Sequence, residues 1–141
     1  MPCVLIPVDG SDISTRVVDA ACWQVANWQL VTVHLLNVQP PINSGIVTKH
    51  LNEDLVYKLQ LQLGETALES VGARLHEAGI AYTSHVEVGD VARTIARCVR
   101  DLRCDQVIMG TRGLGAISGL LLGSVAMKVL HLVDVPVTLV K

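Results

Sequence analysis

The sequence contains no phenylalanine, and aromatic residues make up only 3% of its 141 residues, although half of the chain is hydrophobic. A folded core must therefore be built from valine, leucine, isoleucine and alanine, as in buried parallel strands covered by helices. A chain of this length suffices for one domain and is too short for two of ordinary size. We therefore expect one domain over residues 1–141.

A large excess of charge of either sign is also missing. The formal net charge is −2 and the isoelectric point is near 6.2, so the composition has no electrostatic footprint for nucleic acid. Arginines do recur at helical spacing near residue 100, but aspartates are interleaved with them, which is typical of a solvated helix face. The arginines are Arg93, Arg97, Arg100 and Arg103, and the aspartates are Asp90, Asp101 and Asp105. The sequence predicts no nucleic-acid partner.

Patterns of metal ligands and disulfides are missing as well. The four cysteines, Cys3, Cys22, Cys98 and Cys104, include no CxxC pair and lie in apolar or helical stretches. Such a distribution indicates reduced, packed thiols. The five histidines are scattered, with no HExxH or similar spacing, so we expect no metal site.

Long hydrophobic runs are absent too. No apolar stretch reaches the roughly 18 residues that cross a bilayer. Residues 1–4 lead directly into an expected strand instead of into the charged and apolar parts of a signal segment. We expect a soluble cytoplasmic protein that has no membrane partner.

What the chain does contain is a regular alternation of strand and helix signals, which predicts βαβ units and a parallel sheet. Gly10 allows a tight turn after the first strand, and Ser11 or Asp12 can cap the helix that follows. The fold class is α/β, a doubly wound open sheet with helices on both faces. The expected strands are 3–8, 30–38, 80–88, 105–110 and 135–140, and the expected helices run from Asp12 to about 28 and over 52–78, 90–102 and 119–133.

The segment 52–78 carries two conflicting signals. Its "LQLQL" stretch, residues 59–63, alternates as a strand does. The segment is rich in Leu, Glu, Gln and Ala, and Leu68, Val71 and Leu75 recur at helical spacing, which favours a helix.

Two strand ends are equipped to receive a ligand. In an open parallel sheet, ligands bind beyond the carboxyl ends of the strands where the strand order reverses. The first strand ends in "PVDGS", residues 7–11, and the fourth ends in "GTRG", residues 110–113. Each end combines glycine, a hydroxyl and a formal charge. We therefore expect them to be neighbours, which gives the strand order 3-2-1-4-5.

The glycines after the fourth strand permit close approach to a phosphate chain. Gly110 and Gly113 have no Cβ, so the backbone can expose its amides to a ribose or phosphate. Near Gly123 and Ser124, backbone amides, the serine hydroxyl and nearby helix peptides provide hydrogen-bond donors and a positive partial charge, which suit an anion. Alternatively, GxxG forms only a turn and Gly123 only permits close packing of helix and sheet. Gly115 and Gly119 need nothing beyond loop geometry.

The whole stretch "GTRGLGAISGLLLGS" resembles the universal stress protein family. Its pattern is Gly110, two residues, Gly113, nine residues, Gly123, and then Ser124. The resemblance extends from "VLIPVDGSD" through "HLLNV" and "VGDVARTIAR" to the final "VPVTLVK". It implies an α/β domain with five parallel strands that binds ATP in members that carry this pattern.

The resemblance also implies positions for the nucleotide. Asp9 would lie near the ribose or base, although a helix-capping acid is the alternative for it. Val38 would meet adenine through its backbone, while any buried strand end would look similar. The implied binding residues are Pro7, Val8, Asp9, Val38, Met109, Gly110, Arg112, Gly113, Gly123, Ser124 and Val125.

The sequence favours a nucleotide-dependent regulatory or stress-response protein over a dedicated ATPase. There is no GxxxxGK[ST] sequence, and Asp9 is the only obvious acid near the expected cleft. The expected cofactor is ATP, with or without Mg²⁺, and hydrolysis is at most slow. Two alternatives stay open. One is an adenine-nucleotide-using enzyme, although "PVDGSDIS" lacks an SGGxDS-like loop, and the other is an interaction module that binds no nucleotide.

The last strand suggests an assembly. Residues 135–140 are apolar and are expected at the edge of the sheet, where an unpaired strand is a liability unless it is covered. Pro136 is acceptable at the start of an edge strand. We expect this strand to pair with its twofold mate in a homodimer, as the resemblance also implies.

Overall fold

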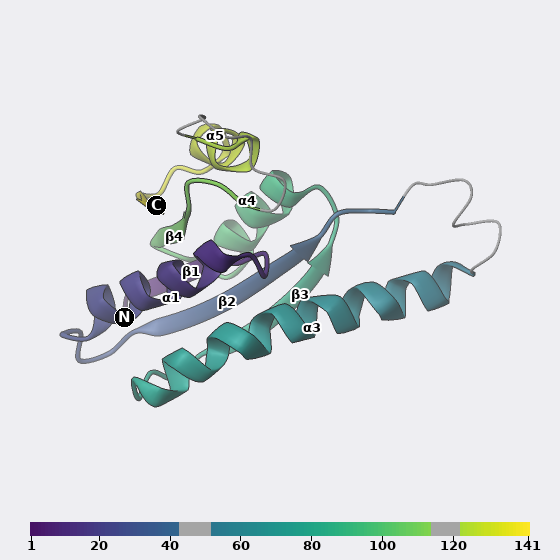
Figure 1. The fold of residues 1–141 in the computed structure, drawn as a ribbon. Helices are drawn as coiled ribbons and strands as arrows, with labels where there is room; N and C mark the ends of the chain where they lie inside the picture. Colours follow the sequence, from purple (N-terminus) through teal and green to yellow (C-terminus); the bar gives the residue numbers. More distant parts are fainter. Residues whose placement is uncertain (43–51, 114–121) are drawn as a thin grey trace.

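A five-stranded, all-parallel sheet forms the centre of the computed structural model, which describes residues 1–42, 52–113 and 122–141 (Figure 1). The strand order is β3-β2-β1-β4-β5, as predicted. The strands are β1 (Cys3–Pro7), β2 (Thr32–Gln39), β3 (Thr83–Val88), β4 (Gln106–Gly110) and β5 (Val137–Val140). The helices are α1 (Asp12–Val25), α3 (Glu53–Glu77), α4 (Val91–Asp101) and α5 (Ser124–Leu132).

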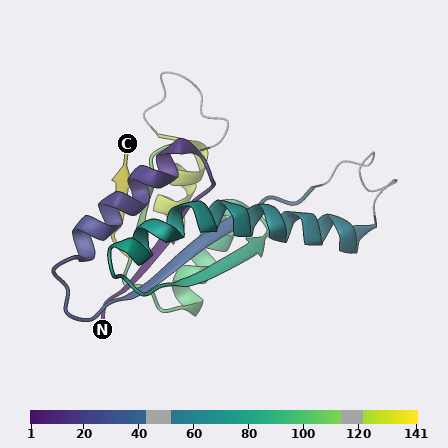
Figure 2. The same ribbon diagram turned by 60° about the horizontal axis from the view of Figure 1, so that its bottom comes forward.

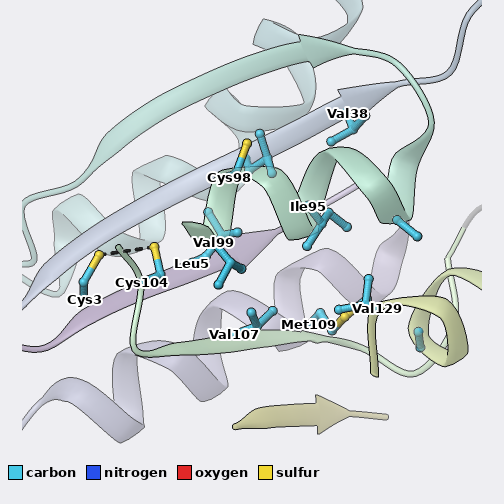
Figure 3. Packing of buried hydrophobic residues seen from close by; sticks show 13 residues of the cluster. Cys3, Leu5, Val38, Ile95, Cys98, Val99, Cys104, Val107, Met109 and Val129 are labelled. Carbon is cyan, nitrogen blue, oxygen red and sulfur yellow. Dashed lines mark hydrogen bonds between the residues drawn. The ribbon is translucent and has the colours of Figure 1, made fainter. Parts of the chain in front are cut away.

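Helices cover both faces of the sheet, and the central strands alternate between two cores. In β1, Val4 and Ile6 belong to the cluster formed with α1 and α3, whereas Leu5 belongs to the cluster formed with α4 and α5. Figure 2 shows α1 and α3 lying side by side over one face. Figure 3 shows the opposite core, where Ile95 and Val99 of α4 pack toward the sheet. Both cores are mainly Val, Leu, Ile and Ala, as expected.

Local chemistry fixes several helix boundaries. Gly10 has a φ of 83°, which allows the turn from β1 into α1, and Gly79 has a φ of 72° just after α3. Asn52 caps α3, because its Oδ1 accepts a hydrogen bond from the Leu55 amide at 2.7 Å. Asp90 caps α4 in the same way, accepting from the Arg93 amide at 3.0 Å. Of the two predicted capping residues, Ser11 is the N-cap of α1 and Asp12 is the first helical residue, but the Ser11 side chain does not bond to the helix amides.

Helix α3 confirms the helical interpretation of residues 52–78 but places an unexpected face against the sheet. Leu68, Val71 and Leu75 are buried as predicted. Toward the start of the helix, the same face continues through Gln60 and Gly64 instead of through the alternating leucines. The Gln60 side-chain amide donates to the Pro40 carbonyl at 2.7 Å, which satisfies it within the fold.

The other predicted boundaries shift by a few residues for identifiable reasons. The Ile80 amide donates to the Leu75 carbonyl at 2.9 Å and so closes α3, which moves the start of β3 to Thr83. Pro136 has no N–H to donate, and β5 begins at Val137, the residue after it, instead of at residue 135. The expected loop at 40–50 lies largely outside the described residues, as do residues 119–121 of the expected helix at 119–133. Within the described residues this helix begins at Ser124.

All four cysteines are free thiols, as predicted. Within residues 1–42, 52–113 and 122–141, no helix combines the length and the apolar character needed to cross a membrane.

Candidate functional site

A cleft of about 400 Å³ opens beyond the carboxyl ends of β1 and β4. Its volume lies within the range of about 300–1,000 Å³ that is typical of small-molecule sites. The strand order reverses between these two strands, so the cleft occupies the topological switch point. All eleven residues expected at the site line this one cleft: Pro7, Val8, Asp9, Val38, Met109, Gly110, Arg112, Gly113, Gly123, Ser124 and Val125.

Asp9 organises the turn between β1 and α1. Its Oδ1 accepts hydrogen bonds from the Ser11 amide at 2.9 Å, the Ser11 hydroxyl at 2.6 Å and the Ser14 hydroxyl at 3.2 Å. The other carboxylate oxygen, Oδ2, lies against Gly113. Asp9 therefore has a structural role at the start of α1 while its second oxygen faces the loop that follows β4.

That loop is tied directly to the start of α5. The Thr111 amide donates to the Val140 carbonyl at 2.9 Å, and the Thr111 carbonyl accepts from the Gly123 amide at 2.6 Å. Gly123 is the N-cap of α5 and has no side chain that could cap the helix. The first amides of an α-helix, here those of Ser124 and Val125, have no carbonyl acceptor within the helix. Ser124 and Val125 both line the cleft.

The packing of the fold by itself explains why glycine occupies positions 110, 113 and 123, without a ligand. A Cβ on Gly113 would collide with Asp9 Oδ2, and a Cβ on Gly110 would lie 2.9 Å from the Arg112 carbonyl oxygen. A Cβ on Gly123 would lie 3.3 Å from the Thr111 carbonyl oxygen, tight against the same loop. Close approach of phosphate is therefore not required to explain them. The features that favour a ligand are the cleft and the hydrogen-bond donors of the residues in its wall.

The opposite end of the cleft is apolar and includes the end of β2. Hydrogen-bonding directions alternate along a strand, and the Leu36 carbonyl accepts from the Val8 amide at 2.8 Å on the β1 side. Val38, two residues further on, therefore directs its amide and carbonyl toward the space beyond the end of β1. Side chains from three elements complete this wall, among them Val38, Ile95 and Met109, which Figure 3 labels.

Several lining residues were not predicted from the sequence. Asn37 is buried, its side-chain amide donates to the Val8 carbonyl at 2.9 Å, and its Oδ1 accepts from Gln39 at 2.8 Å. It thereby holds the end of β1 against β2. A polar residue inside the apolar "HLLNV" strand was the available signal for it. Ser14 and Thr111, also buried, had no comparable signal, and α4 adds Val91 and Ile95.

The charges at the cleft differ between its parts. Arg112 is exposed at the mouth, and the start of α5 contributes the positive end of a helix dipole. Asp9 is the only carboxylate among the described residues of the lining. Within the described parts of the chain, no group of three or more His, Cys, Asp or Glu side chains is arranged to hold a metal ion. The arrangement suits an elongated ligand that has an apolar planar end, hydroxyls near Asp9 and an anionic end at α5.

Comparison with known proteins identifies the family. The model of the universal stress protein family matches residues 2–141. The chain belongs to this family. A curated relative, universal stress protein MJ0531 of Methanocaldococcus jannaschii, is 27% identical over 140 residues, which cover 98% of this chain and 81% of the relative.

Solved structures of family members share the fold. Hypothetical protein MJ0577 superposes with a TM-score of 0.83 at 24% identity, covering 99% of this chain and 95% of the other. An Arabidopsis thaliana family protein with AMP bound gives a TM-score of 0.71 at 23% identity, covering 100% and 92% of the two chains. Other neighbours are a universal stress protein in complex with cAMP and the Archaeoglobus fulgidus protein in complex with dAMP, with TM-scores of 0.72 and 0.70.

Proposed function

We propose that this universal stress protein binds ATP in the cleft between β1 and β4 and acts as a nucleotide-dependent regulatory protein. The observation that carries the proposal is the meeting of an apolar wall, the carboxylate of Asp9 and a helix N-terminus in one cleft of suitable volume. Structural neighbours with bound AMP, cAMP and dAMP support an adenine nucleotide as the ligand class.

The adenine ring would lie at the apolar end. Val38 can offer a backbone donor and acceptor there, and the side chains of Ile95 and Met109 give the ring an apolar surface. Such a combination fixes a base without a charged side chain. Asp9 would face the ribose hydroxyls, because a carboxylate accepts from hydroxyls and repels phosphates.

The phosphates would lie at the start of α5. The amides of Ser124 and Val125 and the hydroxyl of Ser124 can donate to phosphate oxygens, and the helix dipole favours their negative charge. Arg112 could pair with the terminal phosphate from the exposed side. Any Mg²⁺ would be held mainly by the phosphates and water, since magnesium usually retains several waters.

The cleft supports binding better than rapid hydrolysis. A hydrolase needs a base that orients a water for attack on the terminal phosphate. In the described lining the only carboxylate is Asp9, whose Oδ1 accepts three hydrogen bonds from Ser11 and Ser14. We therefore propose at most slow ATP hydrolysis.

A simple experiment tests the proposal. The purified protein is denatured, and any released nucleotide is identified by chromatography. Nucleotide-free protein is then titrated with adenosine, AMP and ATP while its melting temperature is followed, because a ligand of the folded state raises it. We expect the rise to increase from adenosine to ATP. The proposal fails if no nucleotide is released and ATP leaves the melting temperature unchanged.

We also propose a homodimer through β5. Pro136 and Val140 direct their carbonyls to β4, accepting from the Val107 and Thr111 amides, so Val137 and Leu139 direct their amides outward. These amides can pair with the same strand of a second copy. Their hydrogen exchange should slow as protein concentration rises, while light scattering reports a dimer. A monomer at micromolar concentration would contradict the proposal.

A further inference from the structure

Two histidines that are far apart in the sequence meet on one face of the sheet. His34 Nδ1 lies 2.9 Å from His85 Nε2, although 51 positions separate the residues. In the strand register, His34 is opposite Thr83 and His85 is opposite Leu36, so the two histidines are diagonal neighbours on the same face. Their ring centroids are 5.0 Å apart and the rings are tilted by 50°, so they meet through nitrogen atoms and do not stack.

We propose that His34 and His85 form a bidentate site for a divalent transition-metal ion such as Zn²⁺, Cu²⁺ or Ni²⁺. Imidazole nitrogen binds these ions at about 2.0–2.1 Å. Two such bonds at an angle of about 90–110° place the nitrogens roughly 2.9–3.4 Å apart, and the observed distance of 2.9 Å lies at the lower end of this range.

The chemistry of the pair suits a metal ion. A neutral imidazole has one ring nitrogen with a lone pair, and the neutral ring is the form that binds a metal. In the neutral pair, one of the two facing nitrogens carries a hydrogen. Metal binding would move that hydrogen to the far nitrogen of the same ring, so that no net proton is released. A rotation of the rings would then direct both lone pairs to the ion.

The surroundings leave room for solvent ligands. Both histidines are half-buried, so water can complete the coordination shell from the exposed side. Glu87, next on the same face of β3, is held by Arg97 at 3.0 Å and is not needed as a ligand. On β2, His34 lies four residues before Val38, about 13 Å along the strand, and His85 is opposite Leu36, about 7 Å before Val38. Neither histidine lines the cleft. The site is therefore separate from the proposed nucleotide site.

A metal at this position would clamp β3 to β2. Strand β3 lies at the edge of the sheet and pairs only with β2 in the described structure. An ion that bridges the two strands stabilises the folded state according to its concentration relative to its dissociation constant.

The test is a titration of the nucleotide-free protein with Ni²⁺, followed by calorimetry and by the imidazole NMR signals. We expect one ion per chain and simultaneous broadening of the His34 and His85 signals. His34→Asn and His85→Asn should each weaken binding at least tenfold, because each removes one of two ligands. His76→Asn, at an exposed position near the end of α3, is the matched control and should leave binding unchanged.

Each result of the titration either supports or overturns the proposed histidine site. If either variant fails to fold, the other one and the order of broadening in the wild-type protein still decide the question. The proposal is wrong if His85→Asn binds Ni²⁺ as tightly as the wild-type protein. It is also wrong if another histidine broadens before the pair.

Discussion

Replacing Ser124 with proline tests the phosphate end of the proposed site without disturbing the fold. Ser124 is the first residue of α5, a position where proline is favoured because its missing N–H has no partner within the helix. The preceding Gly123 has φ −76° and ψ 163°, the extended conformation that a residue before proline adopts. The substitution therefore removes one amide donor and one hydroxyl from the cleft while preserving the helix.

The expected loss follows from the bonds removed. A hydrogen bond to a charged phosphate contributes about 1.5–3 kcal/mol, which corresponds to roughly 12-fold to 150-fold in affinity. Ser124→Pro removes two donors and should weaken ATP binding by at least the lower of these values, roughly 12-fold. Ser124→Ala, the matched control, removes only the hydroxyl and should cost less. The free energy of unfolding of Ser124→Pro should stay within about 1 kcal/mol of the wild-type value, because proline also restricts the unfolded chain.

The assay is calorimetric titration of the wild-type protein and both variants with ATP and with adenosine. Adenosine carries no phosphate, so its affinity should not change in either variant. The reasoning is refuted if Ser124→Pro binds ATP as tightly as the wild-type protein does. It is also refuted if adenosine and ATP lose affinity equally, because the effect would then not arise from the phosphates.

Three further predictions concern the fold around the site and the histidine pair. Asp9→Ala should destabilise the protein by about 1–3 kcal/mol in urea unfolding, whereas Asp9→Asn, which keeps an acceptor oxygen, should cost less; equal losses would exclude the turn-organising role. Gly64→Ala should lower the free energy of unfolding, because the added Cβ would collide with Val86. The loss should be smaller in a Val86→Ala background, and equal losses in both backgrounds would contradict this packing. Because the pKa of His34 is lowered in the folded state, the free energy of unfolding should be highest above the ordinary pKa of about 6.5 and should decrease as the pH falls below it. His34→Asn should reduce this dependence, and an unchanged pH profile of the urea midpoint in this variant would contradict the prediction.

The architecture was predictable because each strand end and helix face carries a local signal. In α4, for example, Val91, Ile95 and Val99 recur every four residues in the sequence, which is the spacing of one helix face, and this face packs in the core. The start of α3 was less predictable. Its alternating leucines include Leu59 and Leu63, which are exposed by 44% and 61%, whereas Gln60 and Gly64 are buried. Tertiary contacts, and not hydrophobicity alone, determine which face of α3 is buried.

The residues that line the cleft were largely predictable from the sequence, whereas the structural roles of these residues were less so. The glycine pattern selected residues that do line one cleft, yet Gly113 is required by Asp9 even without a ligand. Asn37 was missed because a buried amide in a strand cannot be paired with its partner before the strand order is known. The contact of His34 with His85 was invisible for a similar reason, because pairing of β2 with β3 creates it.

The most direct measurement of the central claim is an NMR titration of the nucleotide-free protein with ATP, with the backbone amides assigned. The account predicts that the largest saturable shifts fall at both ends of the cleft, on Val38 and Met109 near the adenine and on Ser124 and Val125 near the phosphates. Adenosine should shift only the first pair. The account is contradicted if ATP produces no saturable shifts at millimolar concentration, or if the shifts cluster on residues away from the cleft.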